Sequence, residues 1–227
     1  MAIAFDAAID VAGSSVSSVT SANMTVAGSD RCLVGSMVWA DAFVADYNWS
    51  AFKWGGSGGT SLTEFGSASF YSFWGIVTGR LIAPSASTTT LYGAITGTVT
   101  RLCIGAANYT GVDQTTPLGT AANASGQSNA PSVSVTLGTD EWALGWLNTE
   151  GDTCTPGGSQ NQRWEDENAS LAASGDDRTG SGSVAVSWST PGVYDRWVAR
   201  GVNLKPAAAA SASLLPGFTP MAHLLVR

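Results

Sequence analysis

The stretch Arg31-Cys32-Leu33-Val34-Gly35 opens a candidate β-strand at residues 31–40, where a charged residue is followed by an apolar run. The same order recurs in Arg101-Leu102-Cys103-Ile104-Gly105, in Glu141-Trp142-Ala143-Leu144-Gly145 and in Arg196-Trp197-Val198-Ala199. This order is expected where a strand starts with a charge at the solvated rim of a sheet and continues into the core. Because the spacing between the four copies is irregular, we interpret them as convergent strand starts and not as an internal repeat.

Short β-prone runs, separated by clusters of Gly, Ser, Asn and Asp, continue along the chain, and this pattern is typical of a sandwich or a closed sheet. Several runs are apolar without interruption, which predicts strands buried on both faces. The alanine run at residues 207–210 is too short for a stable helix. We therefore predict an all-β fold, an antiparallel β-sandwich, with strands at residues 2–11, 16–26, 31–40, 61–65, 69–77, 88–96, 101–109, 120–124, 132–137, 142–149, 160–168, 182–189 and 196–204.

Charge and composition narrow the classes of partner. The chain of 227 residues carries a net charge of −7, and only 12% of its residues are charged. Its two lysines, Lys53 and Lys205, and its scattered arginines form no basic cluster, so neither nucleic acid nor an anionic membrane is expected as a partner. The first residues lack a secretory-signal pattern, and no segment is apolar over about 18 residues, so we expect synthesis in a cytosol.

Three cysteines, Cys32, Cys103 and Cys154, are too widely spaced for a disulfide framework, and no pair has the Cys-x-x-Cys spacing of a zinc site. Cys32 precedes Gly35 by three residues, whereas Cys103 precedes Gly105 by two. If the two strands share that register, their thiols point to opposite faces, so a disulfide between them is disfavoured. We expect buried free thiols, and neither a metal nor a cofactor.

Residues that commonly carry catalysis are sparse or scattered. The only histidine, His223, lies in an apolar segment near the end of the sequence, so a serine–histidine nucleophile is not expected. Acidic residues occur at predicted strand ends and in loops, where carboxylates are solvated. The catalytic carboxylate pair of a glycoside hydrolase is less expected here than a calcium site. The calcium site also has little support, because the sequence contains no Asp-x-Asp-x-Asp loop. We therefore predict that the protein is not an enzyme; the acidic groups concerned are Asp140-Glu141, Glu150 with Asp152, Glu165-Asp166-Glu167 and Asp176-Asp177.

The aromatic residues within 46–55 are open to two interpretations. Trp54 is expected in the core, because burial of a Trp removes a large apolar area from water. Tyr47 and Trp49 border a polar stretch, so they are candidates for a surface contact with a sugar or with another subunit.

Residues 206–227 differ in composition from the domain predicted at 1–205. They contain no acidic residue, and their prolines disfavour a regular element. They also contain many large apolar side chains, which a monomer is not expected to leave exposed to water. The segment therefore either folds back on its own sandwich as a last strand or docks as an arm on a neighbouring subunit, through Leu214, Leu215, Phe218, Met221, Leu224 and Leu225.

Five motifs, spread over residues 26–206, carry a resemblance to a known kind of domain. They are Arg101-Leu-Cys-Ile-Gly105, Tyr109-Thr-Gly-Val-Asp-Gln-Thr-Thr-Pro-Leu118, Gly55-Gly56 with Thr60-Ser-Leu-Thr63, Thr155-Pro-Gly-Gly-Ser-Gln-Asn-Gln-Arg-Trp164, and Arg196-Trp-Val-Ala with Val202-Asn-Leu-Lys-Pro206. In these motifs the chain resembles a β-sandwich domain that recurs in bacteriophage virion proteins and in bacterial surface proteins. The resemblance implies an antiparallel, jelly-roll-like sandwich without catalytic residues. Residues 41–54 and the arm depart from that pattern, and both are candidates for role-specific contacts.

The resemblance and the arm together predict a bacteriophage structural protein that is made in the host cytoplasm and resides in the virion. We expect a capsid decoration or cement protein that binds the major capsid protein or other virion subunits. We also expect a homo-oligomer, with a trimer as one arrangement. A fibre, spike or tail component is the nearest alternative. A carbohydrate-binding module or adhesin that uses loop aromatics is the alternative from another class of protein.

Overall fold

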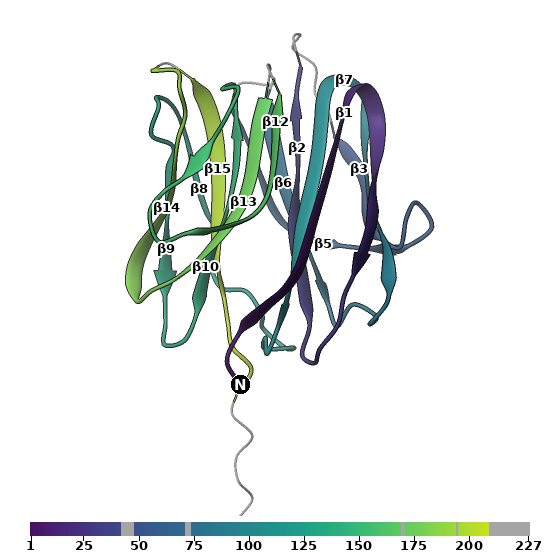
Figure 1. Cartoon of the computed structure of the whole chain (residues 1–227), viewed down its shortest axis with the longest axis vertical. Helices are drawn as coiled ribbons and strands as arrows, with labels where there is room; N and C mark the ends of the chain where they lie inside the picture. The colour runs from purple at the N-terminus through teal and green to yellow at the C-terminus, as the bar shows by residue number, and fades with distance from the viewer. Residues whose placement is uncertain (42–47, 71–73, 169–170, 194, 209–227) are drawn as a thin grey trace, which may run out of the picture.

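The computed structural model describes residues 1–41, 48–70, 74–168, 171–193 and 195–208, and in these ranges it contains strands and no helix. The strands pair antiparallel throughout, so the predicted all-β, antiparallel sandwich is confirmed. No helix in these ranges is long and apolar enough to cross a membrane. Three sheets make up the domain and are arranged side by side across Figure 1.

The largest sheet has seven strands: β1 (Ala4–Thr25), β2 (Cys32–Ala40), β3 (Trp49–Trp54), β4 (Thr60–Ser61), β5 (Thr63–Phe70), β6 (Trp74–Ile82) and β7 (Thr88–Thr110). Their order is β4-β3-β7-β2-β6-β5, and β1 pairs with the other edge of β7 along nearly its whole length. On the opposite edge, β7 pairs with β3 through its first half and with β2 through its second half. The long strands β1 and β7 therefore hold the sheet together.

The two other sheets come from the second half of the chain. The five-stranded sheet has the order β12-β13-β10-β15-β8, and the three-stranded sheet has the order β11-β14-β9. Their bounds are β8 (Ala122–Gln127), β9 (Ser132–Leu137), β10 (Trp142–Thr149), β11 (Thr155–Pro156), β12 (Asn161–Asn168), β13 (Leu171–Thr179), β14 (Gly182–Ser189) and β15 (Arg196–Leu204).

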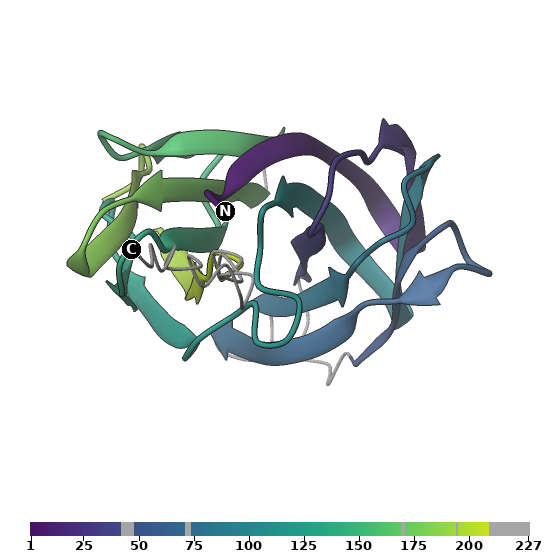
Figure 2. The ribbon, with the colours of Figure 1, turned by 90° about the horizontal axis from the view of Figure 1, so that it is seen from below.

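The first hydrophobic core lies between the seven-stranded and the five-stranded sheets. Val34 and Val38 of β2 contribute to it from one side, and Leu144 and Trp146 of β10 contribute from the other. At the margins of this core β1 lies beside β12, and β5 lies beside β8. Seen from below, the strands therefore surround the interior in a flattened, nearly closed outline (Figure 2).

The second core forms because the seven-stranded sheet folds back on its own outer face. Gly93 and Ile104 both belong to β7, yet a Cβ on Gly93 would lie 2.5 Å from the Ile104 side chain. The strand must therefore bend between them, and Gly97 there has a φ of +84°, which glycine adopts readily. In β1, opposite this bend, a register shift lies between Val16 and Ser18. Such an irregularity lets a strand bend without losing its partner.

The third core lies between the three-stranded sheet and the outer face of the five-stranded sheet. Val186 and Trp188 of β14 pack there with Leu147 and Trp197. As a result, the central strands of the seven-stranded and five-stranded sheets are covered on both faces. Every residue of β2 is buried, and so are nearly all residues of β10 and β15. The prediction of strands buried on both faces is confirmed.

Several predicted boundaries are wrong. The strand predicted at 69–77 combines the end of β5 with the start of β6, and β3 was not predicted as a strand. The separate strands predicted at 2–11 and 16–26 form the single strand β1, and those at 88–96 and 101–109 form β7, because the chain bends at these points and does not stop pairing. Residues 171–179, which lie between the strands predicted at 160–168 and 182–189 and were not predicted as a strand, form the buried strand β13.

Candidate functional site

The start of the arm is held at one end of the sandwich, next to the N-terminus (Figure 1). Pro206 forms an isolated β-bridge with Val112, and the Ala207 N–H donates to the Gly111 carbonyl at 2.8 Å. The ammonium group of Met1 donates to the Ala207 carbonyl at 2.8 Å. These bonds fix the point from which the rest of the arm departs.

An open cavity of about 590 Å³ adjoins this point, and we call it the exit groove. Four segments line it: residues 1–3, 140–142, 179–180 and 206–208. Its volume is within the range of common ligand sites, which is about 300–1,000 Å³. Because the arm forms one wall of the groove, the groove and the arm share the same end of the molecule.

The lining of the exit groove combines apolar side chains with two carboxylates. Ile3 and Trp142 supply apolar surface, and Asp140 and Glu141 supply negative charge. Glu141 accepts hydrogen bonds from the Gly138 N–H at 2.7 Å and from the Asn203 amide at 2.6 Å. A second cavity of about 420 Å³, lined by residues 119–122 and 134–136, also borders on Glu141. The groove therefore offers apolar surface, two carboxylates and the Met1 ammonium group to a partner.

Most of the contact residues predicted from the sequence lie in parts of the chain that the structure does not describe. Tyr47 and the six arm residues lie outside the described residues; the six are Leu214, Leu215, Phe218, Met221, Leu224 and Leu225. Trp49 belongs to β3, where it is half-buried and packs against the second core. Trp54 is buried, as predicted.

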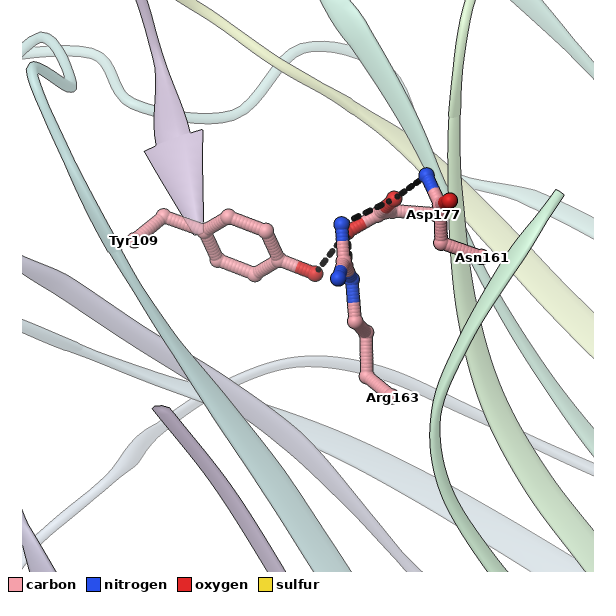
Figure 3. Close-up of polar contacts among 4 residues, drawn as sticks. All are labelled: Tyr109, Asn161, Arg163 and Asp177. Atoms are coloured by element: carbon pink, nitrogen blue, oxygen red, sulfur yellow. Dashed lines mark hydrogen bonds and ion pairs between the residues drawn. The ribbon is translucent and has the colours of Figure 1, made fainter. Parts of the chain in front are cut away.

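A buried polar cluster joins the two main sheets, and Figure 3 shows its four residues. Asp177 of β13 is fully buried and pairs with Arg163 of β12, with Nε–Oδ2 and Nη2–Oδ1 distances of 2.5 and 3.0 Å. The Tyr109 hydroxyl of β7 and the Asn161 amide each donate to Asp177 at 2.9 Å. The Arg163 guanidinium also lies over the Phe5 ring, 4.0 Å from its centroid. A single carboxylate therefore links strands from both sides of the first core.

The ionisation of this cluster follows from its burial. Burial, and then the charge of Asp177, raises the pKa of Tyr109 well above its usual value. The phenol therefore stays protonated and can donate to the carboxylate. Four donor groups, two of them on a cation, compensate the charge of Asp177, as a buried charge requires.

The prediction that Asp176 and Asp177 are solvated loop residues is wrong. Both belong to β13 and are buried, and they point to opposite faces, as neighbours in a strand do. Asp176 Oδ2 accepts hydrogen bonds from the Ser174 hydroxyl and from the Trp188 indole N–H, the latter at 2.7 Å. Its Oδ1 is buried without a hydrogen-bond partner. Burial is the main cause that raises the pKa of Asp176 to about 7.

Three of the other acidic candidates are engaged in separate local contacts. Asp166 forms an ion pair with Arg101 at 2.7 Å, and Glu150 forms one with Arg196 at 2.5 Å. Glu167 accepts a hydrogen bond from the Cys154 N–H at 3.0 Å. Over the ranges that the structure describes, which exclude His223, the acidic residues and cysteines form no group that could hold a metal ion.

The three cysteines are buried and free. Burial raises the pKa of each thiol, that of Cys32 to about 12. The absence of a Cys32–Cys103 disulfide agrees with the prediction, but the reason given for it is wrong, because both thiols belong to the first core. Cys103 pairs opposite Val38, six residues along β2 from Cys32, so about 20 Å separate the two thiols along the sheet.

The sequence-based predictions missed two features of the site. The exit groove has no local signal, because its lining comes from four distant segments of the chain. The buried aspartates do have one: Leu171-Ala-Ala-Ser174 is an apolar, small-residue run directly before them, and it is typical of a buried strand.

Comparisons of this chain with models of protein families, with curated proteins and with solved structures found no match.

Proposed function

We propose that this chain is a structural protein of a bacteriophage virion without enzymatic activity, and in particular a capsid decoration protein. In this proposal the layered β-domain is a rigid body on the shell. The arm at residues 206–227 makes the contacts with neighbouring subunits or with the major capsid protein.

The observation that carries the proposal is the position of β15. This strand lies inside the five-stranded sheet, between β10 and β8, and it is the last strand before the arm. The sheet therefore does not need residues 209–227 to cover β15. Apolar residues of the arm, such as Leu214 and Phe218, remain available for a partner, and burial against a partner is favourable at about 25 cal/mol per Å².

The exposed surface of the domain gives less support to a carbohydrate-binding module. Among the described residues the exposed large hydrophobics are Met1 and Val193, and neither is aromatic. Sugar stacking needs an exposed aromatic face, and Trp49 is half-buried against the second core. A tail or fibre role shares the same arm and remains the alternative within virion proteins.

Incorporation into particles tests the proposal. A first variant lacks residues 209–227. The deletion begins at residue 209 because Pro206 and Ala207 are bonded to the domain. A second variant, L214D/L215D, keeps the full length of the arm and removes apolar surface from it. We expect both variants to be lost from purified particles, where electron microscopy and gel analysis detect the full chain on the shell.

The matched control is Ser183→Asp, which adds a charge at an exposed position of β14 far from the arm in sequence. It should be incorporated like the unaltered chain. Absence of the full chain from particles would refute the virion role. Undiminished incorporation of both arm variants would refute the role of the arm.

A further inference from the structure

The exit groove and the departure point of the arm occupy the same end of the domain. Residues 206–208 form one wall of the groove, and Ala207 is bonded to both Met1 and Gly111. Any arm that enters this groove therefore does so within a few residues of the point where the chain's own arm leaves.

The lining of the groove is suited to cover by another polypeptide segment. Met1, 60% exposed, is one of only two exposed large hydrophobics among the described residues, and it lies in this groove. Asp140 and Glu141 place two carboxylates in the groove, beside the Met1 ammonium group. The arm offers leucine side chains to the apolar part of the lining, and residues 209–227 carry no acidic side chain that the two carboxylates would repel.

The arm is also long enough to span two molecules. Residues 209–227 can extend over roughly 60 Å at about 3.3 Å per residue. Docking of the arm in the groove of its own chain is the competing arrangement, and it predicts a monomer at all concentrations.

We propose that the exit groove receives residues 209–227 of a second copy of this chain, and that two copies exchange their arms about a two-fold axis. In a two-fold contact each molecule presents the same surface to the other, so exit and groove must lie on one surface. Residues 206–208 and the groove do so here, so a two-fold contact at this end brings the start of each arm close to the partner's groove. This inference rests on the proposed role of the arm in assembly, and it names the first partner and the docking site.

Sedimentation of the full-length protein over a range of concentrations tests the exchange. We expect a dimer that dissociates on dilution. Thr179→Trp places a large side chain at an exposed position in the groove and should weaken the dimer at least tenfold. Leu224→Asp, in the arm, should weaken it similarly. Ser183→Trp adds the same bulk at an exposed position of β14 outside the groove and should leave the dimer unchanged. Thermal unfolding of each variant verifies that its domain is folded.

Each other outcome overturns the inference. A monomer or a trimer at all concentrations would exclude the two-fold exchange. A dimer unaffected by folded Thr179→Trp would exclude the groove as the docking site. Particle incorporation separates this inference from the proposed function: a dimer that is never found on particles refutes only the virion role, whereas an arm-dependent virion protein that is monomeric in solution refutes only the exchange.

Discussion

Two neighbouring aspartates meet opposite environments because they point to opposite faces of β13. Asp177 has donors on both oxygens, including the guanidinium of Arg163. Asp176 has two neutral donors on Oδ2 and none on Oδ1. Hydrogen bonds and an ion pair therefore compensate the buried charge of Asp177, whereas burial disfavours charge on Asp176, and the two positions should respond in opposite ways to the same substitution.

Asp176→Asn should abolish a pH-dependent loss of stability. The pKa of Asp176 is raised from 3.8 to about 7 in the folded protein, so the folded state binds the proton more tightly than the unfolded state. Its contribution is most favourable below about pH 4 and is lost as the pH rises to about 7, at roughly 1.4 kcal/mol for each unit of pKa shift. Asparagine has no charge to bury, so the variant should be more stable than the unaltered protein at pH 8.

Denaturant unfolding at pH 5 and pH 8 measures this effect. Asp113→Asn is the control, because hydrogen bonds from the Thr115 and Thr116 N–H groups lower the pKa of Asp113. Its substitution should remove stability at pH 8 and not add it. Equal stability of Asp176→Asn and the unaltered protein at pH 8 would contradict a buried, costly charge.

Asp177→Asn should destabilise the protein at neutral pH. The change leaves the Arg163 guanidinium beside the core without its counter-charge and replaces a carboxylate oxygen with a donor that faces other donors. Loss of one partner from a buried ion pair costs about 3–5 kcal/mol, and the partial exposure of Arg163 favours the lower end of that range. Urea unfolding at pH 7 checks the loss, and an unchanged midpoint would show that the cluster adds no stability.

At the scale of elements, close approach of the sheets depends on glycine. The Trp164 side chain of β12 lies between Gly105 of β7 and Gly175 of β13, where added Cβ atoms would come within 2.3 and 2.1 Å of its ring. The glycine that closes the Arg101–Gly105 motif is therefore required by packing. This agrees with the interpretation of the four similar stretches as convergent strand starts.

Gly105→Ala should destabilise the fold by about 1–3 kcal/mol, because the indole of Trp164 is rigid and lies in the first core, where overpacking forces side chains or backbone to shift. The control is Gly158→Ala, since a Cβ on Gly158 would meet no atom within 4 Å. Thermal unfolding compares the two variants. A Gly105→Ala protein as stable as the control would mean that the sheets can separate without cost.

At the scale of the whole molecule, three cores share two central sheets, and β15, the last described strand, is paired on both edges within the five-stranded sheet. Deletion of residues 209–227 should therefore shift the unfolding midpoint by only a few degrees, which corresponds to about 1 kcal/mol or less. A large fall in the midpoint would instead show that the segment belongs to the fold, as the last strand that the sequence also allows.

The sequence by itself determined the fold class, the uninterrupted burial of strands such as β2, and the core position of Trp54. These properties depend on local alternation and on apolar runs, which can be read within a few residues. Only the tertiary structure decided that 88–96 and 101–109 are one bent strand, that Asp177 is buried and paired with Arg163, and that four distant segments form the exit groove. Such features depend on which strands pair and which sheets stack, and these contacts join residues far apart in the chain that no local pattern specifies.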